Sequence, residues 1–142
     1  MSAPEIIHAT AVAIGGRAVL LQGPSGVGKS DLALRLIDRG ATLVSDDYTL
    51  LVRDGPRLLA RPPATIAGRI ELRGVGIVAV GYLAEAPVAM IFALAETPDR
   101  MPEPRFCTIA GIEVPALALD PLPASAPLKV EWALNHLGEL PA

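Results

Sequence analysis

Short apolar runs separated by glycine- and proline-containing turns occupy the first half of the chain. Their spacing predicts strands over residues 6–14, 17–22 and 42–45, and a helix over residues 31–39. Gly15-Gly16 marks a turn between the first two strands, and Gly40 marks the end of the helix. The pattern therefore predicts a hairpin that leads directly into a strand–loop–helix unit.

In the second half of the chain, glycine- and proline-containing turns again separate short apolar runs. This pattern predicts a hairpin over 48–53 and 57–60, a long functional loop over 61–76, core strands over 76–80 and 87–95, and an exposed connection over 96–104. A further hairpin over 105–109 and 112–119, a linker over 121–127 and a last amphipathic helix over 128–137 complete the chain. Hairpins beside a strand–loop–helix unit predict an α/β fold with a mixed sheet.

Length and composition narrow the class of protein. A chain of 142 residues, 51% hydrophobic, is predicted to form a single domain over residues 1–142. Its longest apolar run, residues 86–95, is too short to span a bilayer, and the N-terminus has no signal-type segment, so no membrane contact and a cytoplasmic location are expected. The net charge of −3 argues against nucleic acid as a partner. The single cysteine, Cys107, excludes an internal disulfide.

One segment carries most of the functional information. It reads Gly23-Pro24-Ser25-Gly26-Val27-Gly28-Lys29-Ser30 and fits the phosphate-binding pattern G-x-x-x-x-G-K-[ST] at every fixed position. In such a P-loop, backbone N–H groups and the N-terminus of the following helix surround phosphate groups. Lys29 would reach the β- and γ-phosphates, and the Ser30 hydroxyl would bind Mg²⁺. The segment predicts a site for a nucleoside triphosphate and Mg²⁺.

Asp46-Asp47 follows the strand over 42–45. The carboxyl ends of strands flanking a P-loop helix meet at one edge of the sheet, so these carboxylates are expected beside the loop. Phosphoryl transfer needs carboxylates that orient a metal and accept the acceptor's proton. The other interpretation of the pair is a solvated turn.

Glu71, Arg73 and His8 are weaker candidates by themselves. Glu71 and Arg73 lie among glycines, where they would supply a metal contact and a cation, or form an ordinary surface ion pair. His8 lies in an otherwise apolar strand, where a histidine usually makes a hydrogen bond within the core.

Taken together, the motifs resemble a known family. His8 before the loop, Leu43-Val44-Ser45-Asp46-Asp47 after it, and Ile70-Glu71-Leu72-Arg73-Gly74-Val75-Gly76-Ile77 beyond resemble the C-terminal catalytic domain of HPr kinase/phosphorylase. The resemblance implies a fold related to phosphoenolpyruvate carboxykinase. It also implies ATP-dependent phosphorylation of a serine on HPr, the phosphocarrier protein of the sugar phosphotransferase system.

The resemblance also implies roles for individual residues. Asp47 or Asp46 would be the base that deprotonates the acceptor serine, with His8 setting their protonation. Ser30, Glu71 and Asp47 would hold Mg²⁺. Arg73 would belong to the segment that is required for both phosphorylation and its reversal. Lys29 and Arg73 would both be catalytic residues.

The chain departs from the family in two places. The N-terminal regulatory domain of long family members is not expected, since the chain begins just before His8. The family's P-x-R-P-G-R-N loop is replaced by Asp120-Pro121-Leu122-Pro123-Ala124-Ser125-Ala126-Pro127, without arginine. Phosphorylase activity is therefore expected to be weak, while a homo-oligomer is possible.

Two other functions remain open at this level. One is a P-loop kinase for a small molecule, in which Asp46-Asp47 binds substrate and metal. The other is a nucleotide-binding regulator that transfers no phosphate.

Overall fold

The computed structural model describes residues 3–138. Two helices and eleven strands occur in this part of the chain. In chain order they are β1 (Glu5–Ile7), β2 (Ala9–Ile14), β3 (Arg17–Gln22), α1 (Lys29–Asp38), β4 (Thr42–Ser45), β5 (Thr49–Asp54), β6 (Arg57–Arg61), β7 (Arg69–Leu72), β8 (Gly76–Ala79), β9 (Ala86–Ala93), β10 (Arg105–Ile109), β11 (Ile112–Ala118) and α2 (Ala126–Leu137).

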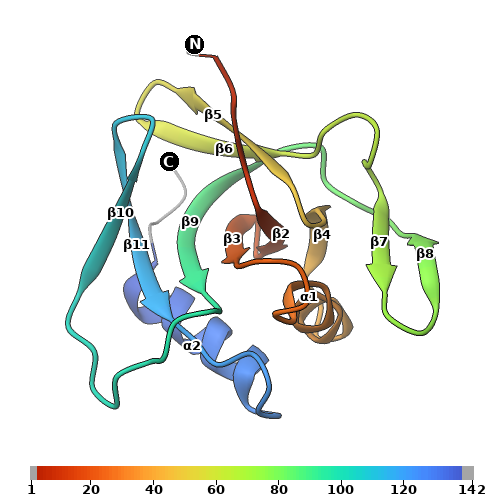
Figure 1. The fold of residues 1–142 in the computed structure, drawn as a ribbon. Helices are drawn as coiled ribbons and strands as arrows, with labels where there is room; N and C mark the ends of the chain where they lie inside the picture. Colours follow the sequence, from red (N-terminus) through yellow and green to blue (C-terminus); the bar gives the residue numbers. More distant parts are fainter. Residues whose placement is uncertain (1–2, 139–142) are drawn as a thin grey trace.

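The main sheet has nine strands and is mixed. Seven of them follow the order β1-β5-β6-β9-β3-β2-β4, β11 also pairs with β9, and β10 pairs with β11. β9 runs parallel to both β3 and β11, and the other strand pairs are antiparallel. β7 and β8 form a separate two-stranded sheet to one side (Figure 1). The predicted α/β fold with a mixed sheet is confirmed.

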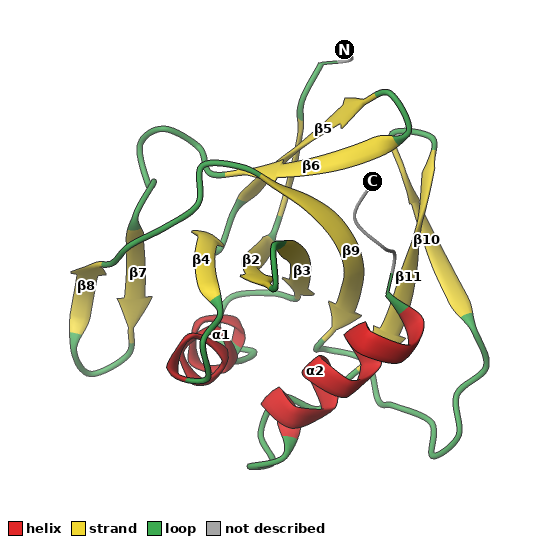
Figure 2. Ribbon diagram, turned by 180° about the vertical axis from the view of Figure 1, so that it is seen from behind, coloured by secondary structure: helices red, strands yellow, loops and turns green. Residues whose placement is uncertain are grey.

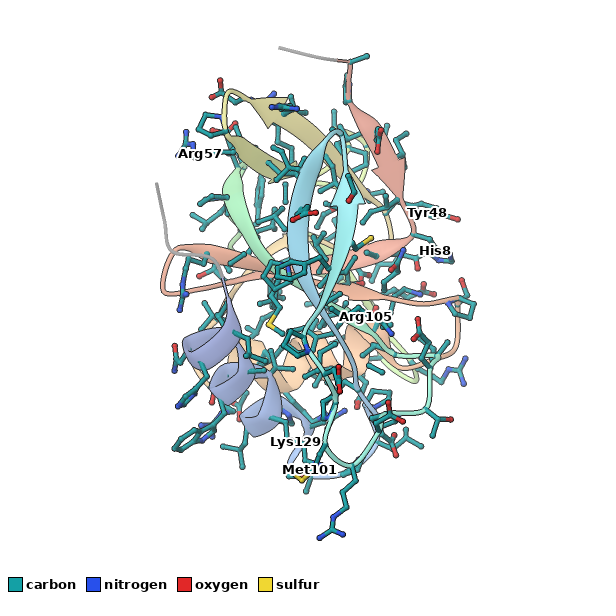
Figure 3. All side chains as sticks on the ribbon, turned by 90° about the vertical axis from the view of Figure 1, so that its left-hand side faces the viewer. His8, Tyr48, Arg57, Met101, Arg105 and Lys129 are labelled. Carbon is teal, nitrogen blue, oxygen red and sulfur yellow. The ribbon has the colours of Figure 1, made fainter. Side chains whose placement is uncertain are left out.

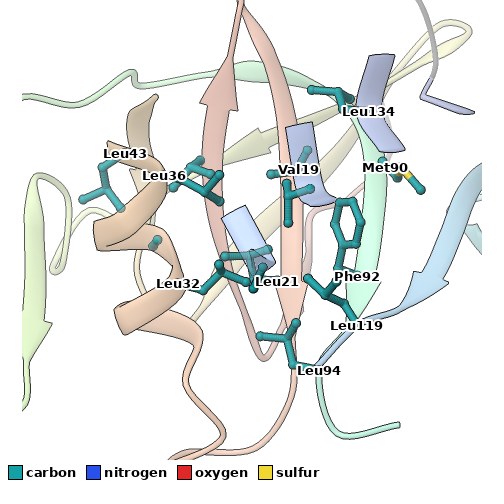
Figure 4. Packing of buried hydrophobic residues seen from close by; sticks show 14 of the residues in the cluster. Val19, Leu21, Leu32, Leu36, Leu43, Met90, Phe92, Leu94, Leu119 and Leu134 are labelled. Carbon is teal, nitrogen blue, oxygen red and sulfur yellow. The ribbon is translucent and has the colours of Figure 1, made fainter. Parts of the chain in front are cut away.

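Both helices cover the same side of the main sheet, as the view from behind shows (Figure 2). Leu32 and Leu36 of α1 and Leu134 of α2 are fully buried against Val19 of β3 and Phe92 of β9 (Figure 4). Burying a leucine side chain contributes about 1.5–3 kcal/mol. This packing fixes the start of α1 relative to the end of β3.

The other side of the sheet encloses a second core. Its members from β2 are Ala9, Ala11 and Ala13, which alternate with residues facing the helices. Leu51 and Leu58, from the β5–β6 hairpin, lie in the same cluster. Small side chains on β2 allow the sheet to curl, so that its outer strands pack over its own centre.

Most predicted elements are confirmed. They include β3, α1, β4, the β5–β6 hairpin, β9, the β10–β11 hairpin, the exposed connection after β9, and a final helix, which begins at Ala126 rather than at residue 128. Pro127 fits there because it lies in the first turn of the helix, where no intrahelical N–H is needed.

Three predictions are wrong. The strand expected over 6–14 breaks at His8, because β1 pairs with β5 whereas β2 pairs with β3 and β4. The long loop expected over 61–76 contains β7, which pairs with β8 as a hairpin. The core strand expected over 76–80 is this exposed hairpin strand β8, in which Ile77 is 71% exposed. In residues 3–138, no helix is long and apolar enough to cross a membrane.

Candidate functional site

The P-loop lies between the end of β3 and the start of α1. Gly28 caps α1 with a φ of 112°, in the left-handed region that side chains rarely adopt. A Cβ on Gly23 would come within 2.7 Å of Val27 Cγ1, so any larger residue at this position would have to displace the Val27 side chain. The loop thus turns tightly into a ten-residue helix. The positive end of that helix can stabilise an anion in the loop.

Lys29 is buried inside this loop, with 4% of its side chain exposed. Its Nζ donates hydrogen bonds to the carbonyl oxygens of Gly23, over 2.7 Å, and Pro24, over 2.9 Å. It also lies 3.3 Å from Oδ1 of Asp47. The ammonium group therefore has three oxygen neighbours, one of them charged, which offsets the cost of its burial.

Asp46 is the buried acceptor at the end of β4, with 7% of its surface exposed. Its Oδ1 accepts hydrogen bonds from Ser30 Oγ, over 2.6 Å, and Thr10 Oγ1, over 3.2 Å. Its Oδ2 accepts a hydrogen bond from the backbone N–H of Glu71, over 2.9 Å. One carboxylate thereby joins the P-loop helix, β2 and β7. The prediction that Asp46-Asp47 lies at the P-loop edge is confirmed.

Asp47 faces a different set of partners. Its Oδ1 lies 2.8 Å from Nε2 of His8, which occupies the break between β1 and β2. Lys29 Nζ lies 3.4 Å from the same nitrogen. Asp47 as a carboxylate only accepts, and Lys29 has nearer oxygen acceptors, so Nε2–H donates to Asp47. Oδ2 of Asp47 accepts no hydrogen bond from residues 3–138 and, with the side chain 40% exposed, remains available.

Glu71 and Arg73 lie on the β7–β8 hairpin. The backbone of Glu71 contacts Asp46, while its side chain is exposed. Arg73 is exposed in the turn after β7. Within the described residues no ion pair joins the two side chains. The β7–β8 hairpin therefore contacts the carboxylate of Asp46 through the backbone of Glu71.

Two residues of the site were not anticipated from the sequence. Thr10 donates to Asp46 and accepts from the backbone N–H of Asp47, over 2.9 Å. The ring of Tyr48 stacks on His8. The available signals were a lone polar residue in the apolar run Ala9–Ile14, and an aromatic residue directly after the aspartate pair.

The oxygen donors beside the P-loop suit Mg²⁺. Ser30, Asp46 and Asp47 present oxygen atoms beside the P-loop, the ligand type that Mg²⁺ prefers. No group of three acidic, histidine or cysteine side chains in residues 3–138 forms a metal cage on its own. Mg²⁺ usually takes one or two carboxylates together with substrate phosphates and water. The residues present therefore fit the ion in the presence of a nucleotide.

A separate groove of about 290 Å³ lies between the connection after β9 and β11. Asp99, Glu103 and Arg105 line it, and no P-loop residue does. With more acidic than basic groups, this groove does not suit a polyphosphate. The P-loop at the start of α1 is therefore the candidate phosphate site.

Comparison with known proteins agrees with a fold of the P-loop nucleotide-binding type. Residues 1–84 match the family described as "HPr Serine kinase C-terminal domain", and the chain belongs to this family. The match covers the P-loop, both aspartates and the β7–β8 hairpin.

Curated relatives match somewhat more than half of the chain. The HPr kinase/phosphorylase of Clostridium beijerinckii is 42% identical over 82 residues, which cover 57% of this chain and 27% of that protein. The HPr kinase/phosphorylase of Enterococcus faecalis is 41% identical over 75 residues, covering 52% and 24%. The aligned region thus spans about a quarter of the length of these relatives.

A solved structure extends the likeness to almost the whole chain. The Hpr(Ser) kinase/phosphatase from Coxiella burnetii superimposes with a TM-score of 0.80 and 30% sequence identity, covering 92% of this chain and 94% of that chain. The likeness therefore extends beyond residues 1–84, where the family match ends.

Proposed function

We propose that the chain is an ATP-dependent serine kinase whose acceptor is an HPr-like phosphocarrier protein. The observation that carries the proposal is the convergence of two carboxylates on one P-loop. Asp46 is bonded to Ser30, and Asp47 is held between His8 and Lys29. Phosphoryl transfer needs a loop that binds the phosphates, a cation beside them and a carboxylate that the acceptor can reach. The P-loop, Lys29 and the half-exposed Asp47 are such groups.

The P-loop would bind the triphosphate through its backbone N–H groups, from Gly23 to Ser30. Lys29 would exchange its contacts with the Gly23 and Pro24 carbonyls for the β- and γ-phosphates. Ser30 and Asp46 would hold Mg²⁺, with Glu71 as a further oxygen donor. When bound, Mg²⁺ neutralises charge on the phosphates.

Asp47 would act as the general base. Its Oδ2 takes the proton of the acceptor serine as the serine oxygen forms a bond to the γ-phosphorus. The bond from that phosphorus to the bridging oxygen breaks, and its electron pair leaves with ADP. His8 holds the other oxygen, Oδ1, so that Oδ2 is directed outward. Arg73 would bring its guanidinium to the transferred phosphoryl group.

Two features support a protein as the acceptor. Asp47 is 40% exposed rather than enclosed in a cavity. The comparisons also match proteins whose names include HPr or Hpr(Ser). A carboxylate near the surface can reach a serine on a folded protein, whereas a small molecule usually needs an enclosing pocket. We place this activity in the cytoplasm, and a homo-oligomer is part of the proposal.

Labelled ATP, Mg²⁺ and a panel of HPr-like proteins would test the proposal. Label on a protein serine supports it. Label on a metabolite would favour a small-molecule kinase, and tight ATP binding without any transfer would favour a regulatory nucleotide-binding protein. Either of these results would overturn the proposed acceptor.

A further inference from the structure

Tyr48 packs flat against the histidine of the site. The ring centroids of His8 and Tyr48 lie 4.8 Å apart, and the ring planes differ by 7° (Figure 3). Tyr48 itself is 47% exposed. A large ring this exposed gains little from burial, so its position on His8 points to a role in the site.

The backbone at Asp47 holds this stack in place. Asp47 has a φ of 67°, and the N–H of Tyr48 donates to the carbonyl of Asp46 over 2.7 Å. A bond between residues two apart around a positive φ is the rare, strained form of the γ-turn. Such strain persists where neighbouring groups fix it. Here Thr10 accepts from the Asp47 N–H, and the Ser45 hydroxyl donates to the Tyr48 carbonyl.

The turn places two groups against one imidazole. Asp47 meets Nε2 of His8 in the plane of the ring, and Tyr48 covers a face of the ring. His8 is 35% exposed in the bend between β1 and β2, and in residues 3–138 its Nδ1 has no hydrogen-bond partner. A hydrogen bond at one nitrogen leaves the ring free to tilt about that contact. The stacked ring supplies the second constraint.

We infer that Tyr48 is a positioning residue for proton transfer, because its ring fixes the His8 plane from which Nε2–H holds Oδ1 of Asp47. This inference rests on the proposed kinase function and adds a residue to it. The ring, rather than the hydroxyl, performs the role, since the ring stacks on His8 and no hydrogen bond joins the hydroxyl to another described residue. Tyr48→Phe keeps the stack, and Tyr48→Leu removes it.

Proton NMR detects the stack of the Tyr48 ring on His8, and the measurement does not require the protein to transfer phosphate. The chain has two histidines, and the other, His136, stacks on Trp132 of α2 and not on Tyr48, so it serves as an internal control. In Tyr48→Leu the His8 ring protons should lose the ring-current shift, while the His136 signals stay in place. In Tyr48→Phe both sets of signals should match the wild type. Unchanged His8 signals in Tyr48→Leu would overturn the inference.

Kinetics then separate positioning from other roles. Tyr48→Leu should lower kcat by about 10- to 100-fold and leave the KM for ATP unchanged, the expected cost of a misplaced catalytic group. Tyr48→Phe should remain near wild type. An equal loss of kcat in Tyr48→Leu and Tyr48→Phe would assign the role to the hydroxyl. A raised KM for the acceptor with unchanged kcat would show that Tyr48 is a docking contact. Either result would refute the inference. If the wild type transfers no phosphate, the proposed function fails, and the NMR comparison alone decides whether the Tyr48 ring stacks on His8.

Discussion

The hydroxyl of Ser30 donates a hydrogen bond to Oδ1 of Asp46 over 2.6 Å, which connects the first turn of α1 to the end of β4. Asp47, the next residue, points instead to His8 and Lys29. Neighbouring carboxylates thus have separate partners, and this separation gives each a different expected phenotype.

Asp46→Asn is expected to destabilise the fold and to raise the Mg²⁺ requirement. The two oxygens of the carboxylate accept hydrogen bonds from Ser30, Thr10 and the Glu71 N–H, whereas the amide has only one acceptor oxygen. A donor left unsatisfied in a buried site costs about 1–3 kcal/mol. Urea unfolding would measure the loss, and a Mg²⁺ titration of transfer should show partial rescue at high metal. Wild-type stability in this variant would contradict the role of Asp46.

Asp47→Asn should behave differently. It is expected to lower transfer roughly 10²–10⁴-fold, because it removes the general base, with little change in the Mg²⁺ requirement. ATP binding should persist, since the P-loop is untouched. Asp54→Asn is the matched control, because Asp54 forms an exposed ion pair with Arg57 away from the loop. Single-turnover rates would measure the loss of transfer. Wild-type rates in Asp47→Asn would mean that the aspartate pair is a solvated turn and that Asp47 is not the base.

Lys29→Ala is expected to weaken ATP binding and to abolish transfer. It removes the cation that lies inside the P-loop and directs its N–H groups to the loop carbonyls. The chain's other lysine, Lys129, is exposed on α2, and Lys129→Ala is the control. Isothermal titration with ATP would compare the three proteins. Equal affinity in wild type and Lys29→Ala would show that the loop is not the phosphate site.

Gly28→Ala and Gly40→Ala form a matched pair of backbone variants. Their φ angles are 112° and 111°, so an added Cβ should cost each about 1–2 kcal/mol of stability. Gly28 is the cap of the P-loop helix, whereas Gly40 follows its other end. Thermal unfolding should show similar losses in both, while ATP affinity should fall only in Gly28→Ala. A parallel fall in affinity would mean that the effect on binding is a general loss of stability.

Reversal of the reaction is expected to be weak. Residues 120–127 contain no arginine, and Arg35 of α1 donates to the carbonyls of Pro121 and Pro123 in this segment. Its guanidinium is therefore engaged in holding the segment rather than available for a second anion. Incubation of seryl-phosphorylated carrier with millimolar phosphate should give little pyrophosphate. Rapid pyrophosphate formation would contradict this expectation.

The sequence predicts the P-loop and its flanking elements well because the signal is local. Gly23, Gly28 and Lys29 carry backbone and charge requirements that no other residue type meets equally. The placement of Asp46-Asp47 at the same edge follows from a general rule of α/β sheets. For these residues, motif and topology suffice.

The errors arise where long-range pairing decides the structure. Residues 6–14 are apolar apart from His8 and Thr10, so nothing local shows that β1 joins β5 while β2 joins β3. β7 is only four residues long and lies between Gly68 and Gly74, which favours a loop, and its pairing with β8 and backbone contact with Asp46 stabilise it as a strand. Which aspartate meets Ser30 depends on the γ-turn at Asp47, a conformation that side-chain alternation does not predict.

The most direct test of the account identifies the phosphorylated atom. The wild-type chain and Lys29→Ala would each be incubated with ATP, Mg²⁺ and an HPr-like carrier, in native form and with its acceptor serine replaced by alanine, and the products analysed by mass spectrometry. The account predicts one phosphoryl group on that serine with the wild-type chain, and none with Lys29→Ala or with the alanine carrier. Phosphate on another residue type, or undiminished transfer by Lys29→Ala, would contradict it.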